Sequence, residues 1–189
     1  QTFMDAITAL LNRNSTPKLI DPAPTSDDRE TIFQAALRAP DHARLRPWRF
    51  LCIEGDSRIL LGEKLAAAAK YENPDIDEAI YNKQLNSPMR APLVVIAVAK
   101  ITEHPKVPEI EQLLSAGAAV TKMLTAAHAL GYAAIWRTGS VSFSRFFMDS
   151  IGLVANEKIV GIVYLGSANG AQKPLPSMET ADFFSTWSG

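Results

Sequence analysis

The stretch Leu93-Val94-Val95-Ile96-Ala97-Val98-Ala99 decides the fold, because every residue in it is apolar. Pro92 and Lys100 bound the run, and its many β-branched residues favour a strand. A strand that does not alternate apolar with polar residues buries both of its faces. We therefore expect residues 93–99 to form a central strand that is covered on both sides.

Elements on both sides of this run predict an α+β domain. Downstream, residues 108–130 form one long helix with Pro108 near its N1 position, and Gly131 follows its end. Upstream, Asp5 and Thr25 are the N-caps of two helices. Strands are expected at 48–53, 133–136 and 159–165, and further helices at 58–70, at 75–86 and before Gly152. These elements do not alternate as regular βαβ units, so a doubly wound sheet is disfavoured for this single domain of residues 1–189.

The amino-acid composition argues against two classes of binding partner, nucleic acids and membranes. The chain has 19 Lys and Arg residues against 20 Asp and Glu residues, so we expect neither a nucleic-acid nor a membrane partner. The apolar run at 93–99 is far shorter than the roughly 20 residues of a membrane-spanning helix. No secretory signal pattern opens the chain, which predicts a cytoplasmic protein. Cys52 lies in an apolar run and is predicted to be a small buried side chain.

Several common chemistries lack their motifs. No G-x-G-x-x-G or G-x-x-x-x-G-K loop is present, which excludes a Rossmann dinucleotide fold and a phosphate loop. The three histidines, His42, His104 and His128, have neither a partner at i+4 nor a nearby cysteine cluster, so we expect no metal site. A nucleophile elbow is also missing.

Three segments together resemble the nitroreductase family, in particular its short branch of NAD(P)H nitroreductases. They are Asn12-Arg13-Asn14-Ser15, then Arg38 to His42 with Pro47 to Phe50, and then Gly131 to Gly139 with its Ile135-Trp136-Arg137-Thr138 core. Their order and spacing extend the likeness over nearly the whole chain. The resemblance implies a mixed central sheet flanked by helices and an intertwined homodimer.

The resemblance also implies where FMN binds. The first segment would contact the ribityl-phosphate half of FMN through Arg13, Asn14 and Ser15, although Asn14 replaces a second arginine of the family pattern. Phosphate carries a charge of roughly −1.5 to −2 and suits arginine and hydroxyl donors. Without the resemblance, an ordinary helix end is the favoured interpretation of these three residues.

The other two segments extend this site. By resemblance, Arg38 and His42 approach the flavin, and Arg46 stands where relatives commonly have glutamine. Trp48 is expected to pack in the core. The third segment would return to the cofactor, with Arg137 as a second phosphate partner; its members are Trp136, Arg137 and Thr138. A nicotinamide-binding surface is implied at Ala126, Ala127, His128, Ala129, Leu130 and Gly131, although small residues at a helix end also suit tight packing.

The implied activity is a ping-pong reduction by NAD(P)H of a small electron-poor acceptor, such as a nitroaromatic or a quinone. The flavin carries the redox step, so no side chain is assigned as catalytic. Reduction of quinones or enones and reductive dehalogenation would use the same pocket. Two other classes stay open: a flavin-binding or flavin-sensing module without turnover, favoured by the departures at Asn14 and Arg46, and an interaction domain without a cofactor.

The C-terminal tail, residues 167–189, ends in three aromatics, Phe183, Phe184 and Trp187. A solvated terminus is not expected to carry such side chains. We therefore predict that residues 183–187 cross to the partner subunit of a homodimer.

Overall fold

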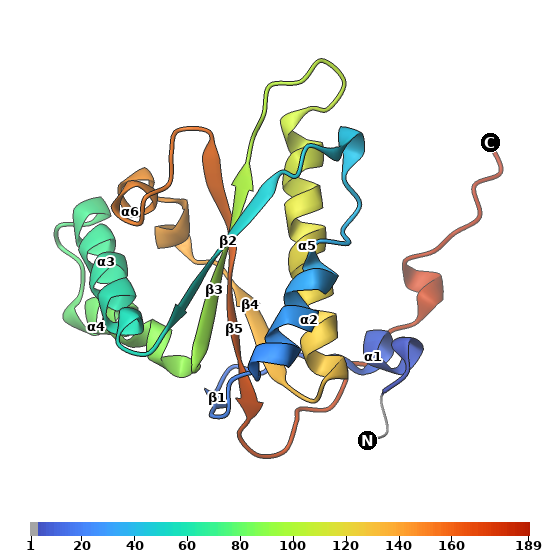
Figure 1. The fold of residues 1–189 in the computed structure, drawn as a ribbon, viewed down its shortest axis with the longest axis horizontal. Helices are drawn as coiled ribbons and strands as arrows, with labels where there is room; N and C mark the ends of the chain where they lie inside the picture. Colours follow the sequence, from blue (N-terminus) through green and yellow to red (C-terminus); the bar gives the residue numbers. More distant parts are fainter. Residues whose placement is uncertain (1–3) are drawn as a thin grey trace.

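A computed structural model describes residues 4–189 and shows a central sheet with helices on both sides (Figure 1). The helices are α1 (Ala6–Asn12), α2 (Ser26–Ala36), α3 (Ser57–Glu72), α4 (Glu78–Asn86), α5 (Glu109–Ala129) and α6 (Arg145–Ser150). The strands are β1 (Leu19–Ile20), β2 (Trp48–Glu54), β3 (Leu93–Lys100), β4 (Ala133–Arg137) and β5 (Glu157–Ala168). Short 3-10 turns follow at η1 (His42–Arg44), η2 (Ser87–Arg90), η3 (Ser140–Phe143) and η4 (Thr180–Asp182). The expected α+β arrangement of a sheet flanked by helices is confirmed.

The sheet is organised around β5, its longest strand. The order is β1-β5-β3-β2, and β4 also pairs with β5. Each pairing among the described strands is antiparallel. In β3, Val95 lies opposite Cys52 of β2 and Val163 of β5, so β3 has a strand on each side.

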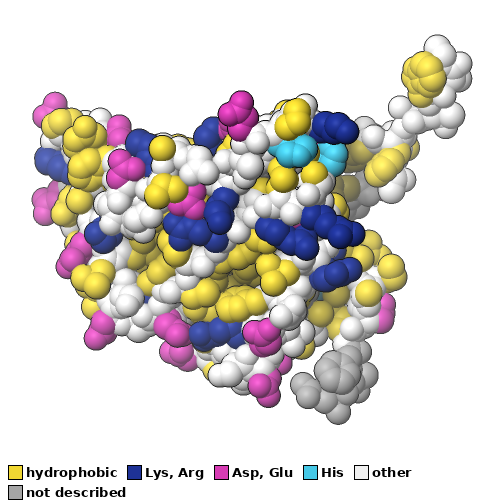
Figure 2. Space-filling view, turned by 45° about the horizontal axis from the view of Figure 1, so that its top comes forward, with side chains coloured by type: hydrophobic (Ala, Val, Ile, Leu, Met, Phe, Trp, Pro, Cys, Tyr) yellow, Lys and Arg dark blue, Asp and Glu magenta, His cyan; other side chains and the backbone are white. Residues whose placement is uncertain are grey.

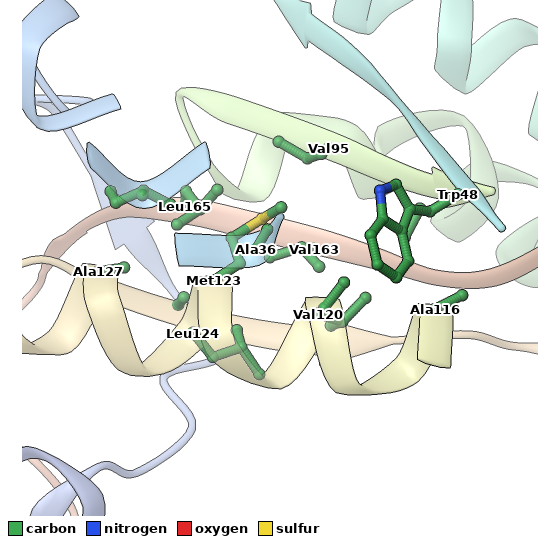
Figure 3. Close-up of a cluster of buried hydrophobic side chains, with 14 of the residues drawn as sticks. Ala36, Trp48, Val95, Ala116, Val120, Met123, Leu124, Ala127, Val163 and Leu165 are labelled. Atoms are coloured by element: carbon green, nitrogen blue, oxygen red, sulfur yellow. The ribbon is translucent and has the colours of Figure 1, made fainter. Parts of the chain in front are cut away.

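The apolar run in β3 is buried on both faces, as its sequence predicts. Leu93, Val95 and Ala97 lie in one core cluster with buried side chains of α2 and α5. Figure 3 shows part of this cluster, with Val120 and Met123 of α5 beneath the sheet. Val94, Ile96 and Val98 belong to a second cluster with α3 and α6. Both helical layers are therefore anchored on one strand.

The predicted helix starts are confirmed at two capping residues. The Asp5 carboxylate accepts from the backbone N–H groups of Ile7 and Thr8, both at 3.1 Å. The Thr25 hydroxyl accepts from the backbone N–H of Asp28 at 3.2 Å. Each cap satisfies N–H groups that the first helical turn leaves without partners.

One detail of the prediction is wrong. Cys52 is exposed instead of buried, because β2 is an edge strand and its apolar run is covered incompletely. Pro108 is the N-cap of α5, directly before the N1 position near which it is expected. Trp48 is buried in the α2 and α5 cluster, as expected. No helix of the described chain has the length and apolarity needed to cross a bilayer.

The C-terminal tail leaves the body of the molecule after β5. Figure 1 shows it running away from the sheet and ending far from it, past α1. Its aromatic side chains face solvent in the single chain: Phe183 is 71% exposed, Phe184 78% and Trp187 88%. Large apolar side chains this exposed are unusual unless another surface covers them.

Candidate functional site

Strand β4 connects two cavities that contain residues of the predicted cofactor site. The first, the β4-start cavity, has a volume of about 240 Å³ and lies beside Ala133 and Ala134. The second, the β4-end cavity, has a volume of about 170 Å³ and is lined by Arg137 and Thr138. The five residues of this strand rise about 3.4 Å each, so the two cavities lie on the order of 14 Å apart along it.

The β4-start cavity brings together the first and the nicotinamide segments of the prediction. Its lining includes Arg13, Asn14, His128 and Gly131. Arg13 is the C-cap residue of α1, and His128 lies in the last turn of α5. The first segment and the nicotinamide segment therefore meet at this cavity, because α1 packs against α5.

Asn14 ties this cavity to the tail. Its side-chain amide donates to the carbonyl of Lys173 at 3.1 Å, and its amide oxygen accepts from the backbone N–H of Ser15 at 3.0 Å. Next to it, the Thr16 hydroxyl donates to the side-chain oxygen of Gln172 at 2.8 Å. The residue that replaces the family's second arginine therefore positions the start of the tail, and Ser15 is left exposed.

His128 carries a buried polar atom without a partner. Its Nε2 makes no hydrogen bond to any described residue. Burial and the nearby charge of Arg13 both lower the pKa of this imidazole below its ordinary value. A neutral histidine nitrogen can accept or donate one hydrogen bond, and this one is unused within the described chain.

The rest of the nicotinamide segment is divided between other surfaces. Ala126 and Ala129 line a groove between α1, α2 and α5. Ala127 is fully buried in the core, and Leu130 packs half-buried against the same cluster. Only His128 and Gly131 of this segment reach the β4-start cavity.

Trp136 packs against the sheet. Its indole N–H donates to the carbonyl of Val160 at 3.1 Å, and its ring covers Gly161, where a Cβ atom would come within 1.9 Å of the indole nitrogen. The small residue at 161 is therefore required by this contact. The indole thereby fixes the end of β4 from which Arg137 and Thr138 project.

The β4-end cavity contains a second arginine that the sequence analysis missed. Arg90, at the end of η2, lines it together with Arg137, and Lys83 of α4 contributes a third cation. The Arg90 guanidinium lies 5.1 Å from the centroid of the buried Tyr164 ring, a cation–π distance. Burial and the neighbouring Arg137 charge lower the pKa of Arg90. Nothing in the local pattern around residue 90 links it to Arg137.

Arg38 and His42 lie apart from both cavities within one chain. Arg38 lines the groove between α1, α2 and α5. The His42 Nδ1 lies 2.7 Å from a carboxylate oxygen of Glu111, at the start of α5. Arg46, where relatives commonly have glutamine, forms an ion pair with Asp41 at 3.1 Å. The single chain therefore does not assemble the second segment with the other two.

Positive charge gathers on one face of the molecule. In Figure 2, Lys and Arg side chains surround an area of hydrophobic side chains on the face toward the viewer. A basic rim around an apolar floor suits a ligand that combines a planar apolar part with an anionic part.

Comparison with known proteins gives a consistent family. Residues 10–167 match the model of the Nitroreductase family. The "Putative NAD(P)H nitroreductase YdjA" of Escherichia coli (strain K12) is 43% identical over 164 residues, which is 87% of this chain and 88% of that protein. A "Putative NAD(P)H nitroreductase" of Haemophilus influenzae is 37% identical over 182 residues, or 95% of this chain and 98% of that protein.

Solved structures share the fold. A nitroreductase-like family protein from Bacillus cereus superposes with a TM-score of 0.82 at 19% identity, covering 100% of this chain and 99% of that one. A nitroreductase from Bacteroides fragilis, solved with bound FMN, gives a TM-score of 0.74 at 20% identity and covers 97% of this chain and 99% of that one.

Proposed function

This chain belongs to the nitroreductase family, and on that premise we propose that it is an FMN-dependent NAD(P)H oxidoreductase. Its acceptors would be nitroaromatics, quinones or similar electron-poor small molecules, reduced by a ping-pong mechanism. Within one chain, Arg13 and Arg137 line separate cavities at the two ends of β4 and do not converge on one phosphate, although the resemblance implies that they would. This pair of cavities is the observation that carries the proposal. Flavin mononucleotide is an elongated molecule with a ring at one end and a phosphate at the other, so one molecule could occupy both cavities.

The residues present fit this cofactor. The β4-start cavity offers the cation of Arg13 and the side chain of His128 as part of its lining. The β4-end cavity offers Arg137 and the hydroxyl of Thr138. These are cations and uncharged hydrogen-bonding groups, as the polar edge and the phosphate of a flavin require. The aliphatic side chains of the sheet would supply the apolar contacts.

In this proposal the protein orients the cofactor and neutralises its negative charge, while bound FMN supplies two-electron redox chemistry between NAD(P)H and the acceptor. Arg137 would offset the negative charge of the ligand, and Thr138 would donate a hydrogen bond beside it. No dinucleotide fold is needed, because NAD(P)H need only stack on an exposed flavin face and leave. The acceptor would then enter the same pocket, which is why we infer a ping-pong order.

Anaerobic stopped-flow mixing tests the reductase function. The FMN-loaded protein is mixed with NADH or NADPH, and the flavin absorbance is followed. We expect at least one of the two to bleach the flavin, and subsequent addition of a nitroaromatic or a quinone to restore the absorbance. Failure of both nucleotides to bleach bound flavin would leave the flavin-binding module without turnover as the better reading.

We further propose that the molecule acts as a homodimer whose second copy covers an apolar face of α1, α2 and α5. Leu10 of α1 is 61% exposed and Leu114 of α5 is 66% exposed. Between the three helices lies an open groove of about 690 Å³, lined mainly by alanines with Arg38 at its edge. Arg38 would face the partner subunit in such a dimer, which offers a route for it to approach a flavin there.

The tail would complete this dimer. Phe183, Phe184 and Trp187 have no cover in the single chain, and a second subunit would provide it. Deletion of the residues after Ser177 is expected to shift sedimentation from dimer toward monomer and to weaken FMN retention. A truncated protein that sediments as an unchanged, FMN-loaded dimer would contradict a crossing tail.

A further inference from the structure

The loop between α2 and β2, residues 41–46, has a strained backbone. Ala43, Arg44 and Arg46 adopt positive φ angles of 60°, 54° and 51°, and no other non-glycine residue of the described chain does so. This left-handed region is uncommon for residues other than glycine and costs free energy at each of them. Strain of this kind persists only where other contacts hold it, so the contacts of the loop show what keeps it in place.

The side chain of Asp41 holds this loop from the inside. Its carboxylate oxygens accept from the backbone N–H groups of Leu45 and Arg46, both at 3.0 Å. The Arg46 guanidinium donates to the same carboxylate at 3.1 Å. Only 5% of the Asp41 side chain is exposed, against 66% of the Arg46 side chain. The loop is therefore closed by a buried carboxylate, and the cation that neutralises this carboxylate lies on the surface.

Arg46 is the only cation that forms an ion pair with Asp41 among residues 4–189. A buried carboxylate needs a counter-charge as well as hydrogen bonds. Without Arg46, loop conformations that expose the carboxylate to water would become more populated, and the left-handed residues would relax. The charge that Arg46 brings to this loop is thus neutralised within the loop itself.

The same loop carries His42, whose ring is held from a second side. The His42 Nδ1 lies 2.7 Å from the carboxylate of Glu111 at the start of α5. Figure 1 shows the loop beside this end of α5. An ionised carboxylate only accepts, so Nδ1 carries the hydrogen of this bond. The Nε2 atom makes no hydrogen bond to a described residue, and 54% of the His42 side chain is exposed, so Nε2 is free to meet a ligand.

We propose that Asp41 and Arg46 form a clamp that positions His42 for its approach to the flavin, with Arg46 acting through Asp41 and not on the cofactor itself. This inference rests on the proposed function, because the approach of His42 to a flavin belongs to it. Both residues of the clamp are positioning residues. They keep the loop in one conformation, and the apparent dissociation constant of a ligand rises as the fraction of protein in the competent conformation falls.

The test measures two quantities, the dissociation constant of FMN on the apoprotein and the urea midpoint of unfolding. The variants are Arg46→Gln, the charge-retaining Arg46→Lys, Asp41→Asn, His42→Ala, and the combination of Arg46→Gln with His42→Ala. Arg44→Gln is the matched control, because Arg44 is an exposed cation of the same loop that makes no ion pair with the described chain. Arg46→Gln changes only a surface side chain and keeps the test valid if Asp41→Asn fails to fold.

We expect Arg46→Gln and Asp41→Asn to weaken FMN by about 10-fold, and Arg46→Lys to weaken it less. His42→Ala should itself weaken FMN. Adding Arg46→Gln to His42→Ala should then change the FMN affinity by no more than about 2-fold, because the clamp has no imidazole left to position. Arg44→Gln should stay within about 2-fold of the wild type.

Losses that multiply in the combined variant would show that Arg46 contacts the flavin independently, and they would overturn the inference. A lower urea midpoint with unchanged FMN affinity would also overturn it, since the clamp would then have a structural role only. The same holds for an Arg44→Gln loss equal to that of Arg46→Gln, and for a His42→Ala variant with wild-type affinity. A wild-type protein that binds no FMN would instead refute the proposed function.

Discussion

Two arginine sites in this molecule differ in how the arginine charge is neutralised. Arg49 on β2 pairs with the buried Glu157 of β5, with its Nε 2.5 Å from one carboxylate oxygen and a terminal nitrogen 2.9 Å from the other. Arg90 and Arg137 have no carboxylate partner in the described chain and face each other. The first charge is neutralised by the fold, and the second has no counter-charge within the described chain. The difference indicates that the fold neutralises one arginine and leaves the other two able to pair with a ligand.

The largest expected effect comes from breaking the paired site. Glu157→Gln should lower the free energy of unfolding by about 3 kcal/mol, because a partly buried Arg49 loses its counter-charge. We expect the low end of the range for buried pairs, since 34% of the Arg49 side chain is exposed. Urea denaturation measures the loss.

The matched control for this experiment is Glu54→Gln in the exposed pair Arg29–Glu54, where 55% of the Glu54 side chain is exposed. That change should cost about 1 kcal/mol or less. Equal losses in the two variants would show that the Arg49–Glu157 pair has no special structural role.

The next effect is expected when the unpaired site is made to resemble the paired one. Gln84→Glu adds a carboxylate to the lining of the β4-end cavity. The new charge should engage the arginines and repel phosphate, which weakens FMN by about 10-fold or more. Fluorescence titration measures this change. Gln84→Met removes the same amide without adding charge and should change FMN affinity much less; similar losses in both variants would contradict a charge-based site.

Acid titration sharpens the comparison with a smaller effect. Hydrogen bonding to Arg49 lowers the pKa of Glu157 in the folded protein. The stability from this shift is therefore fully present above the pKa of an unfolded glutamate, about 4.3, and is lost as pH falls through the lower folded value. The stability difference between wild type and Glu157→Gln should be constant from neutral pH to about 5 and shrink by about 1 kcal/mol below pH 4. A difference that persists unchanged to pH 3 would oppose this assignment.

The smallest effect concerns the apoprotein. Arg137→Gln removes one of two like charges and breaks no hydrogen bond within the described chain, so the apoprotein should gain stability by about 0.5 kcal/mol or less. Thermal denaturation at low ionic strength measures the gain, and added salt should reduce it by screening the repulsion. A clear loss of stability would show that Arg137 has a structural partner.

The sequence predicts the elements well and their assembly less well. The apolar run of β3 identifies a strand buried on two faces, and Asp5 and Thr25 mark helix starts by their side-chain chemistry. Antiparallel pairing around β5 is not encoded in any local pattern, because register depends on contacts between distant strands. Cys52 was misplaced for the same reason, since only the sheet order reveals that β2 is an edge strand.

The same contrast between local pattern and three-dimensional assembly holds for the candidate site. Resemblance identifies Arg13 and Arg137, and the structure places them at the two ends of β4 in separate cavities. Arg90 could not be identified from sequence, because its role in the β4-end cavity depends on Tyr164 and Arg137. These two residues are distant from Arg90 in the sequence and lie near it only in the folded chain. Arg38 and His42 lie apart from both cavities in the single chain, so their approach to a cofactor stays a prediction.

The most direct measurement of the central claim is flavin uptake by the purified protein. The apoprotein is incubated with excess FMN, passed over a gel-filtration column, and examined by visible absorption and by its elution volume. We predict a yellow protein that elutes as a dimer with equimolar FMN per chain. A colourless protein that retains no FMN at any tested concentration would contradict the account.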